Sequence, residues 1–335
     1  PLAVMRLVDA TGHIPRAPEV SFAASEIGLP AFGYNVANDD LNRALAGVAD
    51  RTGGLSIHAT TLRSMAIGAD AIELGLEDGG LLRARLAVGA DGRDSMVRTV
   101  AEIPVRRWDY RQACLVTTLR HTRPHRNVSV EFHTAAGPFT LVPLPGDRSS
   151  LVWMDRPEEI ERWNRLDDRE LAREIARRAH HLLGEMAIDG PRGTIPLAGL
   201  IADRMVGDRT ALVGESCHRF PPIGAQGLNL GLRDAEALAD VLAKARRAGE
   251  DPGSPAVLER YRRMRAPDVA IRTAGVDLFN RSLLTDALPV AFGRTLALAA
   301  ARRFGPLRRT LMRAGLGVPL VDLPRLPGGD RRPLA

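Results

Sequence analysis

The stretch from Ala211 to Asp234 constrains the fold of this chain more than any other part of the sequence. It runs Ala-Leu-Val-Gly-Glu-Ser-Cys-His-Arg-Phe-Pro-Pro-Ile-Gly-Ala-Gln-Gly-Leu-Asn-Leu-Gly-Leu-Arg-Asp. Its pattern predicts a buried strand over 209–213, a loop rich in Gly and Pro, and a long helix that begins near Gly227. The backbone N–H groups of such a loop and helix N-terminus face whatever the loop encloses. The stretch is therefore typical of a cradle for a planar, electron-rich or anionic ligand.

Several side chains in this stretch suit such a ligand. Glu215 directly follows the predicted strand, where its carboxylate can accept a hydrogen bond from a sugar-like hydroxyl at the carboxyl edge of an α/β sheet. Taken alone, Glu215 is better explained as a helix cap or a solvated loop acid. The loop adds prolines that stiffen it, glycines that let backbone approach a flat ligand, and amide side chains: Pro221, Pro222, Gly224, Gln226, Gly227 and Asn229. Each alone is ordinary turn chemistry, but together they favour a binding site.

A second Gly-rich stretch, Gly89-Ala-Asp-Gly-Arg-Asp-Ser-Met-Val-Arg98, has the same layout. A predicted strand ends in it, and Asp91 lies between Gly89 and Gly92. The ordinary interpretation is a β-turn, and an Asp-Gly pair by itself indicates no more than that.

The composition is that of a globular protein and narrows its partners. The chain has 335 residues, of which 45% are hydrophobic and 26% charged, and this is enough for one large domain or two smaller ones. A net charge of +6 attracts acidic partners, namely nucleic acid, anionic lipid or an acidic ligand. Nucleic acid is the weakest candidate and is not expected, because no basic run is interleaved with aromatic residues. Cys114 and Cys217 lack metal-ligand spacing, which favours reduced thiols.

Strand signals dominate the first half of the chain. Residues 1–37 favour strands or loops, and four short strands are expected over 55–59, 62–67, 71–76 and 81–88. Asp78-Gly79 is typical of a hairpin turn. Further antiparallel strands are expected over 113–119, 128–132, 139–143 and 150–154.

Helix signals fill the remainder. Asn38 caps a helix that ends near Gly53, and a charged amphipathic helical segment is expected over 158–183. Ser254-Pro255 opens another helix, which we expect to be interrupted at Pro267. The last part, 287–317, is rich in Leu, Ala and Arg, and its breaks are expected at Pro289 and Pro306.

Together the two Gly-rich motifs resemble the second and third fingerprints of the class A FAD-dependent aromatic monooxygenases. The resemblance implies that Asp91, with Gly92, lies near the FAD pyrophosphate and the NAD(P)H path, and that Glu215 holds the ribityl chain. It implies that the loop and helix start pack on the isoalloxazine ring through Pro222, Gly224, Gln226, Gly227, Leu228 and Asn229. Arg43 matches the Arg of this family that contacts FAD.

The fold that the resemblance implies is α/β. It has a Rossmann-like FAD-binding domain of the glutathione-reductase type, an antiparallel β-sheet substrate domain and a C-terminal helical region. The expected segments are 1–37 for strands and loops of the substrate domain, 38–102 and 201–250 for the FAD-binding domain, 103–200 for the substrate sheet and 251–335 for the helical region. The opening Gly-x-Gly-x-x-Gly unit of the family does not occur in residues 1–335. We therefore expect an FAD-binding domain that is incomplete at its N-terminus.

Four further stretches resemble the ubiquinone-biosynthesis hydroxylases that act on polyprenylated phenols: Tyr110-Arg-Gln112, Gly137-Pro138 to Pro143-Leu144, Phe279-Asn280 and Pro306 to Gly317. The implied activity is hydroxylation of the aromatic ring with NAD(P)H and O2. The alternatives are a flavin monooxygenase acting on a soluble aromatic or secondary metabolite, and a truncated, FAD-deficient chain that serves as a non-catalytic partner.

No catalytic residue and no metal site are assigned from the sequence. His218 is expected to be a positioning residue near the flavin edge, because an electron-rich phenol needs little activation. Neither a signal peptide nor an apolar run of about 20 residues is present. We expect a cytoplasmic protein, with the inner face of the cytoplasmic membrane and a ubiquinone-biosynthesis complex as candidate partners. The arginines of 287–317 suit an anionic membrane and suit a solvated helical cap equally well.

Overall fold

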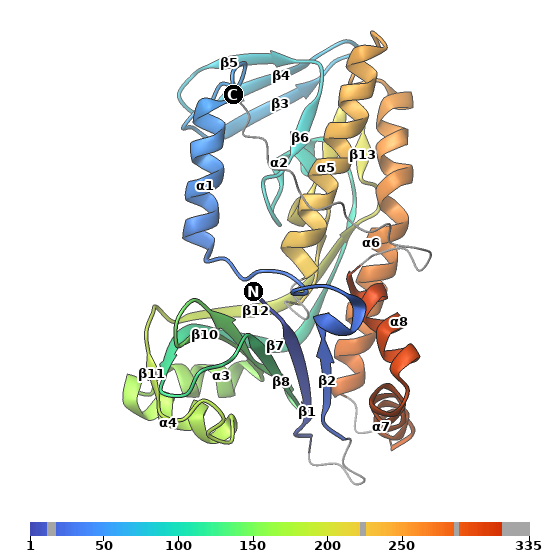
Figure 1. Cartoon of the computed structure of the whole chain (residues 1–335). Helices are drawn as coiled ribbons and strands as arrows, with labels where there is room; N and C mark the ends of the chain where they lie inside the picture. Colours follow the sequence, from blue (N-terminus) through green and yellow to red (C-terminus); the bar gives the residue numbers. More distant parts are fainter. Residues whose placement is uncertain (12–17, 222–225, 285–287, 317–335) are drawn as a thin grey trace. The chain divides into compact units, whose positions relative to one another are not determined.

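The computed structural model describes residues 1–11, 18–221, 226–284 and 288–316. The chain divides into two compact units. The sheet unit comprises residues 1–41, 114–194 and 282–335, and the motif unit comprises residues 42–113 and 195–281, which include both Gly-rich motifs. Strands and helices occur in both units (Figure 1), so the predicted α/β class is confirmed.

Antiparallel strands form the centre of the sheet unit. Strands β8 (Val128–Thr134), β9 (Gly137–Leu144) and β10 (Arg148–Asp155) pair in that order. β1 (Val4–Asp9) lies parallel to β8 and pairs with β2 (Val20–Ala23) on its other side. β7 (Val105–His121), which passes from one unit into the other along the chain, neighbours β10 and also pairs with β11 (Met186–Ile188). The predicted antiparallel strands between 103 and 155 are therefore confirmed.

The core of the sheet unit is aromatic. Helices α3 (Pro157–Asn164) and α4 (Asp168–Arg178) pack along the strands (Figure 1) and account for the predicted helical segment. Trp153 of β10 is 1% exposed and stacks on Trp163 of α3, with ring centroids 5.4 Å apart. The guanidinium of Arg178 lies 4.4 Å from the Trp153 ring, and Phe139 packs edge-on against the same ring. Both helices are thus anchored to the sheet through one tryptophan.

The C-terminal helices belong to the sheet unit. α7 (Leu288–Arg303) contacts β2, and α8 (Gly305–Leu316) contacts the short 3-10 helix η1 (Ala24–Ile27). The Arg308 guanidinium donates from Nε to Glu26 Oε2 at 2.7 Å, and this ion pair ties α8 to η1. The predicted breaks at Pro289 and Pro306 are confirmed. Each proline lies at the second position of its helix, where the missing N–H costs nothing.

The motif unit contains two small sheets and four helices in its described residues. One sheet has the order β13 (Val206–Gly207), β14 (Thr210–Leu212), β6 (Ala87–Gly89), and the other has the order β3 (Leu62–Ile67), β4 (Ile72–Leu76), β5 (Leu81–Ala84). The helices are α1 (Asn38–Arg51), α2 (Met96–Val100), α5 (Gln226–Arg247) and α6 (Pro255–Leu284), of which α1 and α6 extend past the unit boundaries. β12 (Gly193–Ala202) pairs with β15 (His218–Arg219).

Three predictions about individual elements were wrong. Residues 55–59 form no strand, and Leu55 and Ile57 stay 53% and 66% exposed, since no neighbouring strand satisfies their backbone. The single strand expected over 81–88 is two strands that belong to different sheets, β5 and β6. Helix α6 continues through Pro267, where ion pairs of Arg265 and Asp268 on either side hold the helix against its neighbours.

Truncation of a core leucine in the sheet unit should destabilise the protein strongly. Leu151 is fully buried and faces Leu141 across the β9–β10 pair. We expect Leu151→Ala to lower the free energy of unfolding by about 2–5 kcal/mol, because it removes apolar contacts and leaves a cavity. Leu296→Ala, at a leucine that is 60% exposed, should change it by less than about 0.5 kcal/mol. Urea denaturation followed by circular dichroism measures both values, and equal effects would contradict the assigned core.

Candidate functional site

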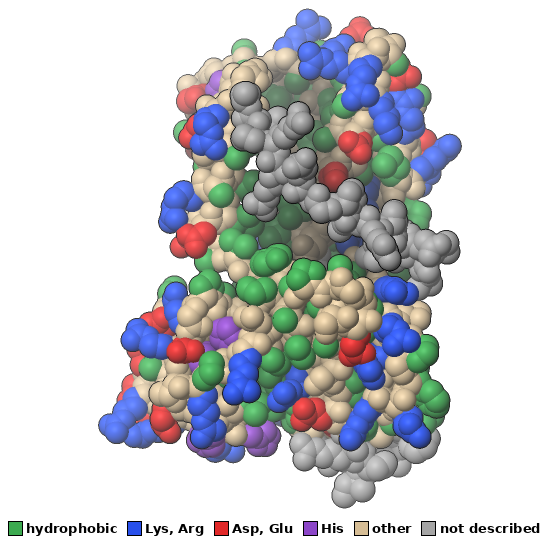
Figure 2. Space-filling view, in the orientation of Figure 1, with side chains coloured by type: hydrophobic (Ala, Val, Ile, Leu, Met, Phe, Trp, Pro, Cys, Tyr) green, Lys and Arg blue, Asp and Glu red, His purple; other side chains and the backbone are tan. Residues whose placement is uncertain are grey.

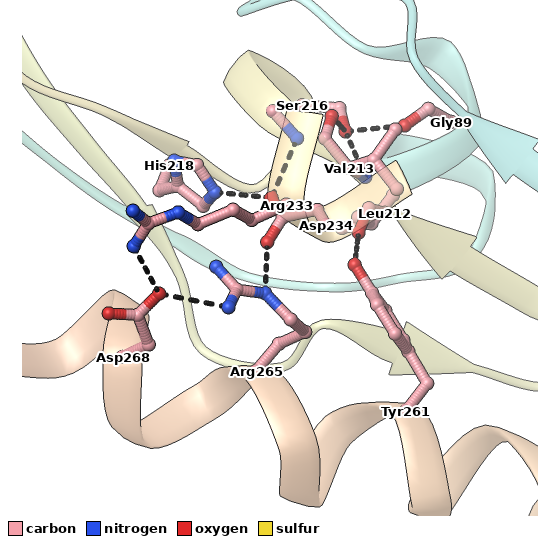
Figure 3. A network of polar contacts seen from close by, with 11 residues as sticks. Gly89, Leu212, Val213, Ser216, His218, Arg233, Asp234, Tyr261, Arg265 and Asp268 are labelled. Carbon is pink, nitrogen blue, oxygen red and sulfur yellow. Dashed lines mark hydrogen bonds and ion pairs between the residues drawn. The ribbon is translucent and has the colours of Figure 1, made fainter. Parts of the chain in front are cut away.

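The two Gly-rich motifs meet at one edge of the β6–β14 pair. These strands are parallel, with Gly89 opposite Leu212, so their carboxyl ends lie together. The Val213 N–H donates to the Gly89 carbonyl at 3.0 Å, and Ser216 Oγ donates to the same carbonyl at 2.6 Å (Figure 3). Arg98 donates from a terminal nitrogen to the Ser216 carbonyl at 2.7 Å. Stretches far apart in the sequence therefore form one structure.

Asp91 organises the first motif. Its Oδ2 atom accepts hydrogen bonds from the Met96 N–H at 2.8 Å and the Val97 N–H at 3.2 Å, at the start of α2. Ser95 caps the same helix by accepting from the Arg98 N–H. Gly92 has a φ of +78°, a left-handed conformation that suits glycine. The exposed Asp91 carboxylate thus ties the loop to the start of α2.

Glu215 lies in the middle of the second motif, on the 3-10 turn η2 (Gly214–Ser216). Its side chain is exposed, as are Gly227, Leu228 and Asn229 in the first turn of α5. A Cβ atom on Gly231 would lie 3.2 Å from the Gly214 Cα atom, a tight contact that would push the turn and α5 apart by a few tenths of an ångström. The acid that follows the strand and the beginning of the helix therefore belong to one compact feature.

The other predicted site residues have different positions. Arg43 lies on α1, where its side chain is exposed. Gln226 is the first residue of α5. Pro222 and Gly224 lie outside the described residues. The assignment of all ten residues to FAD binding stays a prediction.

A buried polar network lies beneath the η2 turn, between α5 and α6 (Figure 3). His218 Nε2 donates to Asp234 Oδ2 at 2.6 Å, and Arg265 Nε donates to Asp234 Oδ1 at 2.8 Å. Asp268 then bridges Arg265 at 2.9 Å and Arg233 at 3.7 Å. Tyr261 of α6 donates its hydroxyl to the Leu212 carbonyl, at the end of β14.

The Asp234 carboxylate is ionised. Burial by itself raises the pKa of Asp234, but the hydrogen bond and charge of His218, the hydrogen bond of Arg265 and that of the Gly214 N–H lower it below its ordinary value. Asp234 is the last residue of the stretch singled out in the sequence, and the sequence pattern predicted no function for it. Its spacing of three residues from Gly231 puts both on one helix face, which is the signal that could have marked it.

Residues of the subgroup motifs form a second polar cluster in the motif unit. The Tyr110 hydroxyl of β7 donates to Asp277 Oδ1 at 2.8 Å, and Asn280 Nδ2 donates to Gln112 Oε1 at 3.0 Å. Gln112 and Asn280 are 4% and 0% exposed. The motifs Tyr110-Arg-Gln112 and Phe279-Asn280, which are distant in sequence, thus meet where β7 packs on α6.

A family model described as "FAD binding domain" matches residues 26–273, which is most of the chain. The chain belongs to this family of FAD-dependent monooxygenases. It is 38% identical over 318 residues to the ubiquinone hydroxylase UbiL of Rhodospirillum rubrum, a match that covers 95% of this chain and 73% of that protein. It is 35% identical over 300 residues to the 3-demethoxyubiquinol 3-hydroxylase of Escherichia coli, covering 89% and 76%. The predicted family is confirmed.

Solved structures support the same fold. PqsL, a probable FAD-dependent monooxygenase from Pseudomonas aeruginosa, aligns with a TM-score of 0.68 and 25% identity over 88% of this chain and 81% of that one. The p-nitrophenol 4-monooxygenase PnpA from Pseudomonas putida aligns with a TM-score of 0.71 and 17% identity over 94% and 82%. The predicted FAD-binding fold of this α/β protein is thereby confirmed.

Both cysteine thiols of this family member should be unreactive in the folded protein. Burial raises the pKa of Cys114 and of Cys217 to about 12, with the Asp234 charge adding to the effect at Cys217. Because the thiolate is the reactive form, we expect almost no reaction with a disulfide reagent at pH 8 and reaction of two thiols in guanidinium chloride. Absorbance of the released thiol measures both, and rapid reaction of native protein would contradict the buried placement.

Proposed function

We propose that this protein hydroxylates the aromatic ring of a polyprenylated phenol in ubiquinone biosynthesis, using FAD, NAD(P)H and O2. Two findings support the proposal: the chain belongs to the FAD-dependent monooxygenases, and its sequence is 38% and 35% identical to those of two ubiquinone-pathway hydroxylases. The single structural observation that carries it is that β6 and β14, the strands that precede Asp91 and Glu215, end at the same carboxyl edge of their sheet. In open α/β sheets this edge is where ligands bind.

The residues at this edge fit the flavin and ribityl part of FAD. Glu215 presents an exposed carboxylate, an acceptor suited to ribityl hydroxyls, and it belongs to the η2 turn, which contacts α5. The dipole of a helix favours negative charge next to its N-terminus. Gly227, Leu228 and Asn229 are exposed in the same turn, where they can pack on a flat ring. We assign Asp91, Gly92 and Arg43 to the remaining contacts.

FAD, when bound, supplies the activation of O2 and the oxygen transfer, and the protein supplies orientation and exclusion of water. We assign no catalytic base, because a phenol is already electron-rich. The segment 103–200 remains our candidate for the substrate domain, since its strands contribute an apolar, aromatic interior that suits a prenyl chain. Segments 38–102 and 201–250 remain our candidates for the cofactor domain.

We also propose peripheral binding to an anionic membrane, where a prenylated substrate dissolves. No described helix is long and apolar enough to cross a membrane. Helix α8 exposes Leu307 and Leu311, which are 41% and 47% exposed and lie one turn apart, next to Phe304, which is 60% exposed. Arg side chains lie among hydrophobic ones over α7 and α8 (Figure 2), and they include the exposed Arg303. An apolar stripe flanked by cations is typical of an interfacial helix.

The enzymatic proposal is tested with the purified protein, FAD, NAD(P)H and phenols with or without a prenyl chain. We expect O2-dependent hydroxylation of the prenylated phenol, detected as a mass increase of one oxygen. Glu215→Gln should weaken FAD binding roughly tenfold, through loss of charge-assisted hydrogen bonds. Glu236→Gln, at an exposed glutamate on α5, is the matched control and should not change it. Hydroxylation of small phenols alone would favour a soluble substrate, and no product from any phenol would refute the proposal.

The membrane proposal is tested by flotation with vesicles of phosphatidylcholine alone or mixed with phosphatidylglycerol. The unmodified protein should float with the anionic vesicles. The double substitution Leu307→Ser and Leu311→Ser should weaken binding roughly tenfold or more, because it removes the apolar stripe. Leu81→Ser, at a leucine that is 81% exposed in the motif unit, is the control and should bind normally. Equal binding of all three proteins would argue against α8 as the contact.

A further inference from the structure

Asp234 connects three elements of the motif unit and is completely buried. Its Oδ2 atom accepts from the Gly214 N–H at 3.1 Å and from His218 Nε2 at 2.6 Å, and its Oδ1 atom accepts from Arg265 Nε at 2.8 Å. Gly214 begins the η2 turn, Asp234 belongs to α5 and Arg265 belongs to α6 (Figure 3). One carboxylate therefore joins the turn to two helices.

The η2 turn is held on both sides of Glu215. On the N-terminal side, Gly214 is fixed by the hydrogen bond to Asp234 and by its close contact with Gly231, one helical turn earlier on α5. On the C-terminal side, Ser216 Oγ donates to the Gly89 carbonyl at 2.6 Å, and Arg98 donates to the Ser216 carbonyl. The backbone position of the exposed Glu215 is thus set by the contacts of Gly214 and Ser216 on either side of it.

The α6 end of this arrangement is itself anchored. A terminal nitrogen of Arg265 pairs with Asp268 at 2.9 Å, and Asp268 also pairs with Arg272 at 2.7 Å. Arg265 is 6% exposed, so its charge is nearly as buried as that of Asp234. Replacement of a buried ion pair by apolar residues is often neutral or stabilising. A contribution to stability is therefore a weak explanation for the presence of the Asp234–Arg265 ion pair. The geometry that the pair imposes on the η2 turn is a stronger explanation.

We propose that Asp234 is a positioning residue of the flavin site, and that Arg265 holds it in place. Asp234 fixes the η2 turn on α5 so that Glu215 meets the ribityl hydroxyls next to the helix start. Asp234 does not touch the cofactor in this proposal and acts through Glu215. The inference rests on the proposed function, because it assigns the ribityl contact to Glu215.

The first test compares FAD affinity in Asp234→Asn and Asp251→Asn. Asp251 is the matched control, because it also forms an ion pair, at 2.6 Å, with a mostly buried arginine of the motif unit, Arg209. In the described hydrogen bonds, the Asp251 side chain contacts neither η2 nor α5. We expect Asp234→Asn to weaken FAD binding roughly tenfold to hundredfold. Asp251→Asn should leave it within about twofold. Flavin fluorescence measures affinity, and thermal denaturation of the apoprotein measures stability separately.

The second test is a double-mutant cycle between Asp234→Asn and Glu215→Gln. If Asp234 acts through Glu215, its substitution should have little further effect on FAD affinity once Glu215 is replaced, so the two effects should not add. Asp251→Asn combined with Glu215→Gln should behave additively. A purely structural role of Asp234 would instead give additive effects in both cycles.

Should Asp234→Asn fail to fold, Arg265→Lys decides the question, since it keeps the charge and loses the Nε donor. Arg265→Lys should also weaken FAD binding, and it should lower the melting temperature less than Asp234→Asn does. The positioning role would be overturned if the unmodified protein binds FAD and the Asp234→Asn protein binds it with the same affinity. If Asp234→Asn does not fold, an unchanged affinity in Arg265→Lys would overturn it. Either result would leave the proposed function intact. No FAD binding by the unmodified protein would overturn both.

Discussion

The parallel pairing of β6 with β14 is the interaction on which the motif unit depends. Three residue pairs align the ends of the strands, so Gly89 and Leu212 finish at the same level. The Gly89 carbonyl then accepts from both Val213 and Ser216, and the two Gly-rich motifs become one surface. Without this register, Asp91 and Glu215 would be unrelated turn residues. The cofactor site that we propose is a consequence of strand alignment.

Buried charge supports this surface from below. Asp234, Arg265 and Asp268 form a chain of ion pairs between α5 and α6, and burial alone would make each charge costly. The cost is offset because Asp234 accepts three hydrogen bonds, which also keep its pKa low. These buried hydrogen bonds and ion pairs fix the backbone of the η2 turn that carries the exposed Glu215. This division between an exposed acceptor and a buried support is typical of preorganised sites.

Local sequence signals predicted much of the fold. A cap and a first-turn proline predicted the starts of α1 and α6, Pro289 and Pro306 predicted breaks that coincide with the first turns of α7 and α8, and Asp78-Gly79 predicted the β4–β5 hairpin. The errors occurred where tertiary contacts overrule local preference. Residues 55–59 have a strand-like sequence but no pairing strand, and Pro267 sits within a helix that its neighbours hold in place.

The sequence by itself determined the family, the two motifs and the residue types that suit FAD, because these depend on short stretches with fixed spacing. Only the tertiary structure decided that Gly89 supports Ser216, that Gly231 admits Gly214, and that Arg265 neutralises Asp234 from another helix. The physical reason is that backbone preferences act over a few residues. Contacts between distant residues depend on the packing of whole elements, which no local pattern encodes.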